Sequence, residues 1–351
     1  MRPGSVQDEE NVMDTHTQPP PAEDHAALLD NLARLADASL PLWDVEDGAT
    51  TRLINLSENA TYLVEMTSGR RTVLRIHRED YHTRNAIACE LAWMKALREE
   101  GGVETPPAIP GRDGNLIQRG QVPGLPRPRY MVMFEFVEGV EPDESQDLTK
   151  PFERLGAVSA RLHLHAMGWK RPDNFERLIW DFDHTIGATP NWGDWREAPN
   201  MDREAQAILQ RQEDVIRRRL AAYGKAPDRY NLIHADIRLA NLLIDGDETR
   251  VIDFDDSGFG WFMYDVATAL SFIEDNPQVP NLIDAWLRGY RTVRDLPKAD
   301  VDEIPTFVML RRMCLLAWIG SHSETDLAQE QAPHFTRVSC ELAEDYLSRF
   351  A

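Results

Sequence analysis

The first half of the chain shows short runs of branched and aromatic residues that alternate with polar turns. A helical pattern over residues 84–100 interrupts these runs and ends at Gly101-Gly102. The short runs predict β-strands, and their close spacing predicts an antiparallel meander. The expected strands cover residues 51–56, 61–66, 71–77, 114–119 and 129–137.

The pattern becomes mostly helical after Gly139, with apolar residues recurring at three- and four-residue intervals. The chain is therefore expected to be α+β, with a nucleotide-binding lobe over 25–138 and a catalytic and substrate lobe over 139–351. Residues 25–40 predict an amphipathic helix, and residues 1–24, polar and rich in proline, predict a disordered tail. Further helices are expected over 151–167, 203–223, 281–293 and after Ile304.

A β-hairpin is expected within residues 242–251, where two apolar runs flank the turn signal Asp245-Gly246. A turn over 245–248 places Leu242 opposite Val251, and Asn241 near Asp253 at the open end of the hairpin. Facing residues in an antiparallel pair lie roughly 4.5–5.5 Å apart. Amide and carboxylate oxygens that meet in this way suit Mg²⁺ better than a soft metal.

The segment around this hairpin carries a motif, His234-x-Asp236-x-x-x-x-Asn241, followed by Ile-Asp-Phe at 252–254 and Tyr-Asp at 264–265. The spacing resembles the catalytic loop and metal-binding aspartate of the protein-kinase-like superfamily. Over residues 45–320 the chain is most similar to the aminoglycoside phosphotransferase and choline kinase family. The resemblance implies a two-lobed, protein-kinase-like fold, ATP and Mg²⁺ as cofactors, and phosphoryl transfer to a small-molecule hydroxyl.

The resemblance also implies roles for individual residues. Asp236 would position the acceptor hydroxyl and accept its proton, Arg238 would contact the γ-phosphate, and His234 and Asp265 would hold the catalytic loop. Arg75 stands where kinases carry lysine, which is a departure because a guanidinium differs from an ammonium in reach and shape. The implied metal ligands are Asn241, Asp253 and Asp255, and the implied nucleotide-binding residues are Ser57, Asn59, Arg75, Glu90, Glu135 and Val137.

Composition narrows the classes of partner and compartment. The chain has 351 residues and a net charge of −21, which argues against general binding to nucleic acid or an anionic membrane. Three widely spaced cysteines lack metal-ligand spacing, and no apolar run is long enough to cross a bilayer. A cytoplasmic protein, monomer or homodimer, is expected.

Two other activities remain as alternatives. One is a protein Ser/Thr kinase of the same fold. The other is a phosphatase, because Asp181-x-Asp183-x-Thr185 resembles the nucleophile motif of haloacid-dehalogenase enzymes, although only a short apolar run precedes it. A non-catalytic, pseudokinase-like module is disfavoured because Asp236, Asn241 and Asp253 are all present.

The acceptor is left open among aminoglycosides, choline or ethanolamine, homoserine, other sugars and amines, and protein serines. Residues 169–200 contain four tryptophans, which either pack this segment onto the large lobe or line an acceptor pocket. Under the second interpretation, Asp181 and Asp183 would bind an amine on the acceptor.

Overall fold

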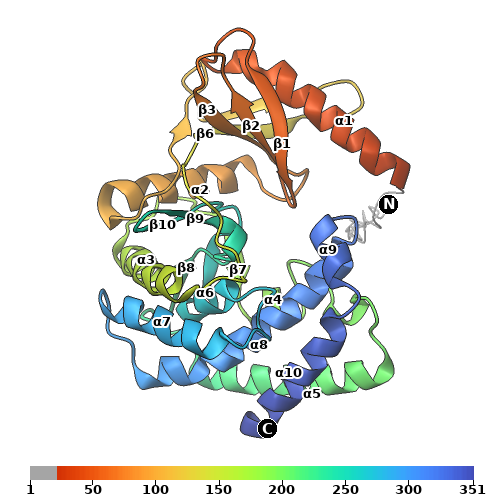
Figure 1. Cartoon of the computed structure of the whole chain (residues 1–351), viewed down its shortest axis with the longest axis vertical. Coiled ribbons are helices and arrows are strands. Elements are labelled where there is room, and N and C mark those ends of the chain that lie inside the picture. The colour runs from red at the N-terminus through yellow and green to blue at the C-terminus, as the bar shows by residue number, and fades with distance from the viewer. Residues whose placement is uncertain (1–21) are drawn as a thin grey trace, which may run out of the picture.

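The computed structural model describes residues 22–351, which fold into a small β-rich lobe above a larger, mainly helical lobe (Figure 1). The prediction of a disordered tail falls almost wholly outside the described residues, and helix α1 (Ala22–Ser39) begins where the description begins. The α+β class and the two-lobed, protein-kinase-like fold are confirmed.

The small lobe is an antiparallel sheet in the order β1-β2-β3-β6-β4, with β5 also paired to β6. Its first three strands form the predicted meander. Helix α1 packs on one face of the sheet through Leu32, Leu35 and Ala36, and α2 runs beneath the other face, toward the large lobe (Figure 1). The elements are β1 (Thr50–Leu56), β2 (Ala60–Glu65), β3 (Arg71–Ile76), α2 (Arg84–Ala96), β4 (Ala108–Ile109), β5 (Ile117–Gly120) and β6 (Arg129–Glu135).

The connection between the lobes is short. Strand β6 ends at Glu135, and Val140 already pairs with Ile244 of the large lobe, with both N–H···O distances at 2.9 Å. The predicted boundary between the lobes, between residues 138 and 139, lies within this connection.

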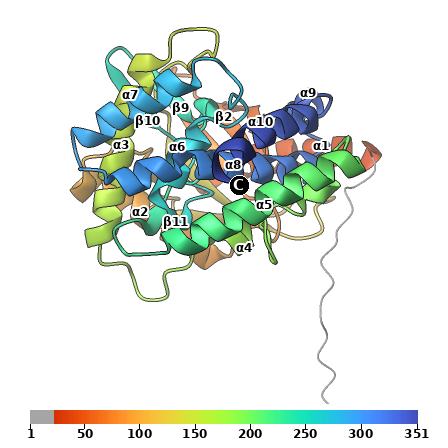
Figure 2. The same ribbon diagram turned by 90° about the horizontal axis from the view of Figure 1, so that it is seen from below.

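The large lobe is built on long helices that surround the catalytic segment. Seen from below, α5 and α10 lie side by side across the lobe, next to α8 (Figure 2). Its helices are α3 (Thr149–Gly168), α4 (Phe182–Thr185), α5 (Arg203–Tyr223), α6 (Phe262–Ala269), α7 (Val279–Arg291), α8 (Lys298–Ser321), α9 (Asp326–Gln331) and α10 (Phe335–Phe350).

The strands of the large lobe form two small sheets. The predicted hairpin is β9 (Leu242–Asp245) with β10 (Glu248–Val251), and its register, Leu242 with Val251 and Ile244 with Thr249, is the expected one. The second sheet was not expected from the sequence: β11 (Gly258–Trp261) pairs in parallel with β7 (Leu178–Trp180) and antiparallel with β8 (Tyr230–Ile233).

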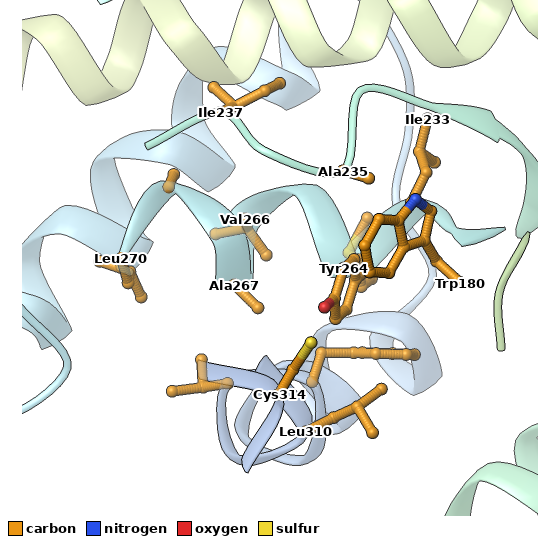
Figure 3. Close-up of a cluster of buried hydrophobic side chains, with 14 of the residues drawn as sticks. Trp180, Ile233, Ala235, Ile237, Tyr264, Val266, Ala267, Leu270, Leu310 and Cys314 are labelled. Atoms are coloured by element: carbon orange, nitrogen blue, oxygen red, sulfur yellow. The ribbon is translucent and has the colours of Figure 1, made fainter. Parts of the chain in front are cut away.

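A hydrophobic cluster supports the segment that follows β8. Ala235 and Ile237, in the loop after β8, pack against α6. Leu310 and Cys314 of α8 close the cluster from the other side (Figure 3). Helix α8 is long and apolar enough to cross a membrane, but 83% of its most apolar window is buried inside the protein. It is therefore the central core helix of the large lobe.

Candidate active site

The loop between β8 and β9 is held by one buried carboxylate. Asp265 on α6 accepts hydrogen bonds from the backbone N–H groups of His234 (3.2 Å) and Ala235 (2.8 Å), and His163 on α3 contacts it at 3.0 Å. Ala235 has φ of +68°, a left-handed conformation that costs a non-glycine residue roughly 1–2 kcal/mol. The two bonds to Asp265 offset the strain and shape the loop.

Asp236 lies at the centre of this loop, and both of its carboxylate oxygens are oriented. Oδ1 accepts from Nη2 of Arg311 at 2.6 Å, and Oδ2 accepts from Nδ2 of Asn241 at 2.8 Å. Arg238 also approaches Oδ2, with its Nε at 3.4 Å. A carboxylate held in one orientation is suited to position an acceptor hydroxyl within hydrogen-bond reach.

The backbone N–H of Ile252 donates to the Asn241 carbonyl at 3.0 Å, which places Asn241 beside Asp253 at the open end of the hairpin, and Asp255 follows two residues later. The amide nitrogen of Asn241 is used by Asp236, which leaves the amide oxygen for a cation. Oδ1 of Asp255 is buried and forms ion-pair contacts rather than hydrogen bonds, with His82 Nε2 at 3.5 Å and with Arg75 Nη1 and His77 Nδ1 at 3.8 Å. These hard oxygen donors fit Mg²⁺, whose role would be to bridge and neutralise phosphate oxygens. The metal and its ligands remain a proposal.

The charges around Asp253 and Asp255 do not balance one another. Burial, with the neighbouring carboxylates of Asp255 and Glu90, raises the pKa of Asp253 against the opposing effect of Arg75. Burial acts the same way on Asp255, but His82 and Arg75 hold its pKa well below the ordinary value. A divalent cation would relieve the repulsion between these carboxylates.

Arg75 and Glu90 are brought together between β3 and α2, as the resemblance implied. Nη2 of Arg75 lies 2.6 Å from Oε1 of Glu90, and Nη1 lies 3.2 Å from Oδ1 of Asp253. Both side chains are buried. The guanidinium therefore links the small lobe to the segment that carries Asp253, and its contact with nucleotide phosphates remains a prediction.

The remaining nucleotide-binding candidates occupy the expected places, with two of them already engaged within the protein. The amide of Asn59 donates to Asp255 Oδ2 at 2.7 Å, and its oxygen accepts from the Arg78 backbone at 3.1 Å. The N–H of Glu135 donates to the Pro107 carbonyl at 2.9 Å. Ser57 lies at the β1–β2 tip and Val137 follows β6. Contacts of all four with ATP remain predictions.

Sequence reasoning missed several residues that contact the site. Arg311 contacts Asp236, and Tyr81 donates to the Asp256 carboxylate. Glu58, at the β1–β2 tip, accepts from Trp318 Nε1 at 2.9 Å and so joins the small lobe to α8. The available signal was Arg311-Arg312 inside an otherwise apolar helix, because arginines are rarely buried there without a partner.

Asp181 is already engaged by other side chains of the large lobe. Its contacts favour neither the hydrolase alternative nor the amine-binding role, and the amine-binding role stays a prediction. Asp181 caps the N-terminus of α4 and pairs with Lys225 Nζ at 2.7 Å and His184 Nδ1 at 2.7 Å. The preceding strand β7 belongs to a three-stranded sheet without alternating βα units. Trp180, Trp192 and Trp195 are buried, so these rings pack the segment onto the large lobe.

A catalytic loop, a hairpin-borne oxygen cluster and a buried arginine–glutamate pair under a small antiparallel sheet define a kinase-like phosphotransferase. A family model for the phosphotransferase enzyme family matches residues 49–300, and the chain belongs to this family. Amicoumacin kinase of Bacillus subtilis (strain 168) is 24% identical over 272 residues, covering 74% of this chain and 77% of that protein.

Solved structures agree with this assignment. A microcompartment-associated aminopropanol kinase is 46% identical, with a TM-score of 0.82, covering 89% of this chain and 97% of that one. An amicoumacin kinase in complex with AMP-PNP, Ca²⁺ and Ami is 20% identical, with a TM-score of 0.72, covering 92% and 96%. The protein is an ATP-dependent kinase that phosphorylates a hydroxyl group of a small molecule.

Proposed function

We propose that the acceptor is a small amino alcohol of the 1-amino-2-propanol type and that Mg²⁺ is the metal. The observation that carries the proposal is the 46% identity to an aminopropanol kinase over 89% of this chain. We also place the protein in the cytoplasm, because its three cysteines are free thiols.

The charges near Asp236 support an ammonium-bearing acceptor. Burial, together with the carboxylates of Glu58 and Asp236, raises the pKa of Asp256 well above its ordinary value. Asp256 is buried and Glu58 is largely so. An ammonium group from the acceptor would balance these carboxylates.

In the proposed reaction, Asp236 orients the acceptor hydroxyl and takes its proton as the oxygen attacks the γ-phosphorus of ATP. The bond between the γ-phosphorus and the β–γ bridging oxygen breaks, and ADP leaves. Arg311 and Asn241 hold the Asp236 carboxylate, while Arg238 and Arg75 supply positive charge for the phosphates. Mg²⁺, when bound by Asn241, Asp253 and Asp255, would neutralise phosphate charge. Positioning and charge neutralisation dominate such transfers.

The test is ADP release by the purified protein with 1-amino-2-propanol, ethanolamine, choline, homoserine, an aminoglycoside and the neutral isostere 1,2-propanediol. We expect kcat/KM to be highest for 1-amino-2-propanol and at least about 10-fold lower for the diol, because the diol lacks the ammonium that would balance the charge of Asp256 and Glu58. Equal or faster turnover of the diol would reject the ammonium requirement.

The Asp236→Asn variant separates catalysis from binding. It should bind ATP as the unchanged protein does and lower phosphoryl transfer by roughly 10²-fold or more, the loss typical for a positioned general base. Transfer at an unchanged rate would reject the role of Asp236.

A further inference from the structure

A cavity of about 460 Å³ opens in the small lobe, and its lining residues His77 and His82 lie 3.8 and 3.5 Å from Oδ1 of Asp255. It lies between the β3–α2 connection and the β5–β6 hairpin. Arg75, Asp236 and Asp253 are not among its lining residues. Those residues are His77, Arg78, Glu79, Asp80, His82, Thr83, Arg84, Arg119, Arg127, Pro128, Arg129 and Tyr130.

The side chains that line this cavity carry a net positive charge, whereas the chain as a whole is negative. Five arginines and two carboxylates line it, which leaves an excess of three positive charges in a protein of net charge −21. Both carboxylates form ion pairs with the same two arginines. Arg127 pairs with Glu79 and Asp80, and Arg129 pairs with Glu79 at 3.3 Å. The other three arginines, Arg78, Arg84 and Arg119, have no carboxylate partner among the side chains described, residues 25–351.

Arg129 forms a buried part of the cavity wall. Only 7% of its surface is exposed, and its Nε has no hydrogen-bond partner within the described chain. Burial and the positive charges of Arg127 and Arg78 lower the pKa of its guanidinium. A buried donor among like charges is costly unless an acceptor is supplied. An anion in the cavity would accept a hydrogen bond from this donor and would balance the positive charge around it.

The cavity is also connected to the metal-binding segment. Nε2 of His82, which lines the cavity, lies 2.9 Å from the backbone oxygen of Asp255. Thr83, the N-cap of α2, and Arg84, its first residue, place the positive end of that helix at the cavity wall. A ligand there would contact the same loop that positions Asp255.

We propose that this cavity is a second anion site, which binds a small phosphate-bearing molecule through Arg84, Arg119 and Arg129. Guanidinium groups match phosphate oxygens in geometry and charge, and the volume admits a ligand larger than inorganic phosphate. Occupancy would stiffen the β3–α2 connection and, through His82, the Asp255 loop. The site is independent of which acceptor the kinase uses.

Isothermal titration calorimetry with inorganic phosphate tests the site, at constant ionic strength and with saturating Mg²⁺ and AMP-PNP to fill the nucleotide site. Phosphate should bind with one site per chain. The double variant Arg84→Gln/Arg119→Gln should raise Kd at least about 10-fold, since hydrogen bonds to charged groups contribute that much or more. Its kinase activity without phosphate should be unchanged.

The matched control is Arg161→Gln/Arg291→Gln, which removes the same charge from exposed positions in the large lobe. It should leave the phosphate Kd within about 2-fold. The proposal fails if phosphate does not bind, if both double variants weaken binding equally, or if phosphate binds without AMP-PNP but not in its presence. Displacement by AMP-PNP would assign the phosphate to the nucleotide site instead.

Discussion

The guanidinium of Arg311 lies 2.6 Å from Oδ1 of Asp236, although 75 positions separate the two residues in the chain. Arg311 is 1% exposed, and it also contacts Ser271 Oγ at 2.9 Å and the Ala235 carbonyl at 3.4 Å. Three partners hold the guanidinium in place. It therefore determines where one oxygen of the proposed base can point.

We predict that Arg311→Lys lowers kcat by roughly 10²-fold while the KM for ATP changes little. Lysine keeps the charge but loses the planar set of donors that reaches Asp236, Ser271 and Ala235 together. Steady-state kinetics measure both constants. The control is Arg312→Lys, because Arg312 is equally buried and pairs with Glu274 at 2.6 Å. It should lower the melting temperature and spare kcat. Equal kcat losses in both variants would assign Arg311 to stability alone.

Asp253→Asn is expected to abolish the stabilisation of the protein by Mg²⁺ with AMP-PNP. The change removes a negative ligand from the proposed metal site and leaves the hairpin fold intact. Thermal unfolding with and without nucleotide gives the result. Asp247→Asn, on the exposed turn of the same hairpin, should keep full stabilisation. If Asp253→Asn were stabilised as strongly as the unchanged protein, Asp253 would not bind the metal.

For Glu58→Gln, the KM for an amino alcohol should rise at least about 10-fold while the KM for ATP stays within about 2-fold. Glutamine keeps the shape and the acceptor for Trp318 but removes the charge that would attract the ammonium. Asp181→Asn, at a carboxylate already paired with Lys225, should leave both constants unchanged. A rise in the KM for the amino alcohol in the Asp181 variant alone would instead place the ammonium at Asp181.

The free energy of unfolding should decrease as the pH falls below about 6.5. Burial lowers the pKa of His163 in the folded protein, against its bonds to Asp265, whereas the unfolded chain has an ordinary histidine pKa. The unfolded state therefore binds the proton first, and acid favours unfolding. Below the unfolded pKa this residue contributes a slope of up to about 1.4 kcal/mol per pH unit.

Urea unfolding at several pH values measures that slope. His163→Gln should reduce it, and His334→Gln, at an exposed position, should not. An identical slope in the His163 variant would show that His163 does not account for the acid sensitivity.

Short-range spacing in the chain was enough to predict much of this protein. The alternation in residues 51–77 predicted the meander, and Asp245-Gly246 predicted a hairpin whose register was correct at every paired residue named. The His-x-Asp-x-x-x-x-Asn spacing brought Asp236 and Asn241 to one loop. These features depend on local backbone geometry and side-chain period, which a sequence expresses directly.

Tertiary packing decided the rest, because those contacts join residues that no local pattern relates. The strand pairing of Gly258–Trp261 with Leu178–Trp180 crosses about eighty positions, and apolar runs of three or four residues do not specify their partners. The cavity proposed as an anion site is also lined by two segments that are separated in the sequence, so no local pattern predicts it. Asp181 looked chemically active in sequence, but Lys225, 44 positions later, neutralises it. A buried charge takes its role from its partners, and only the fold supplies them.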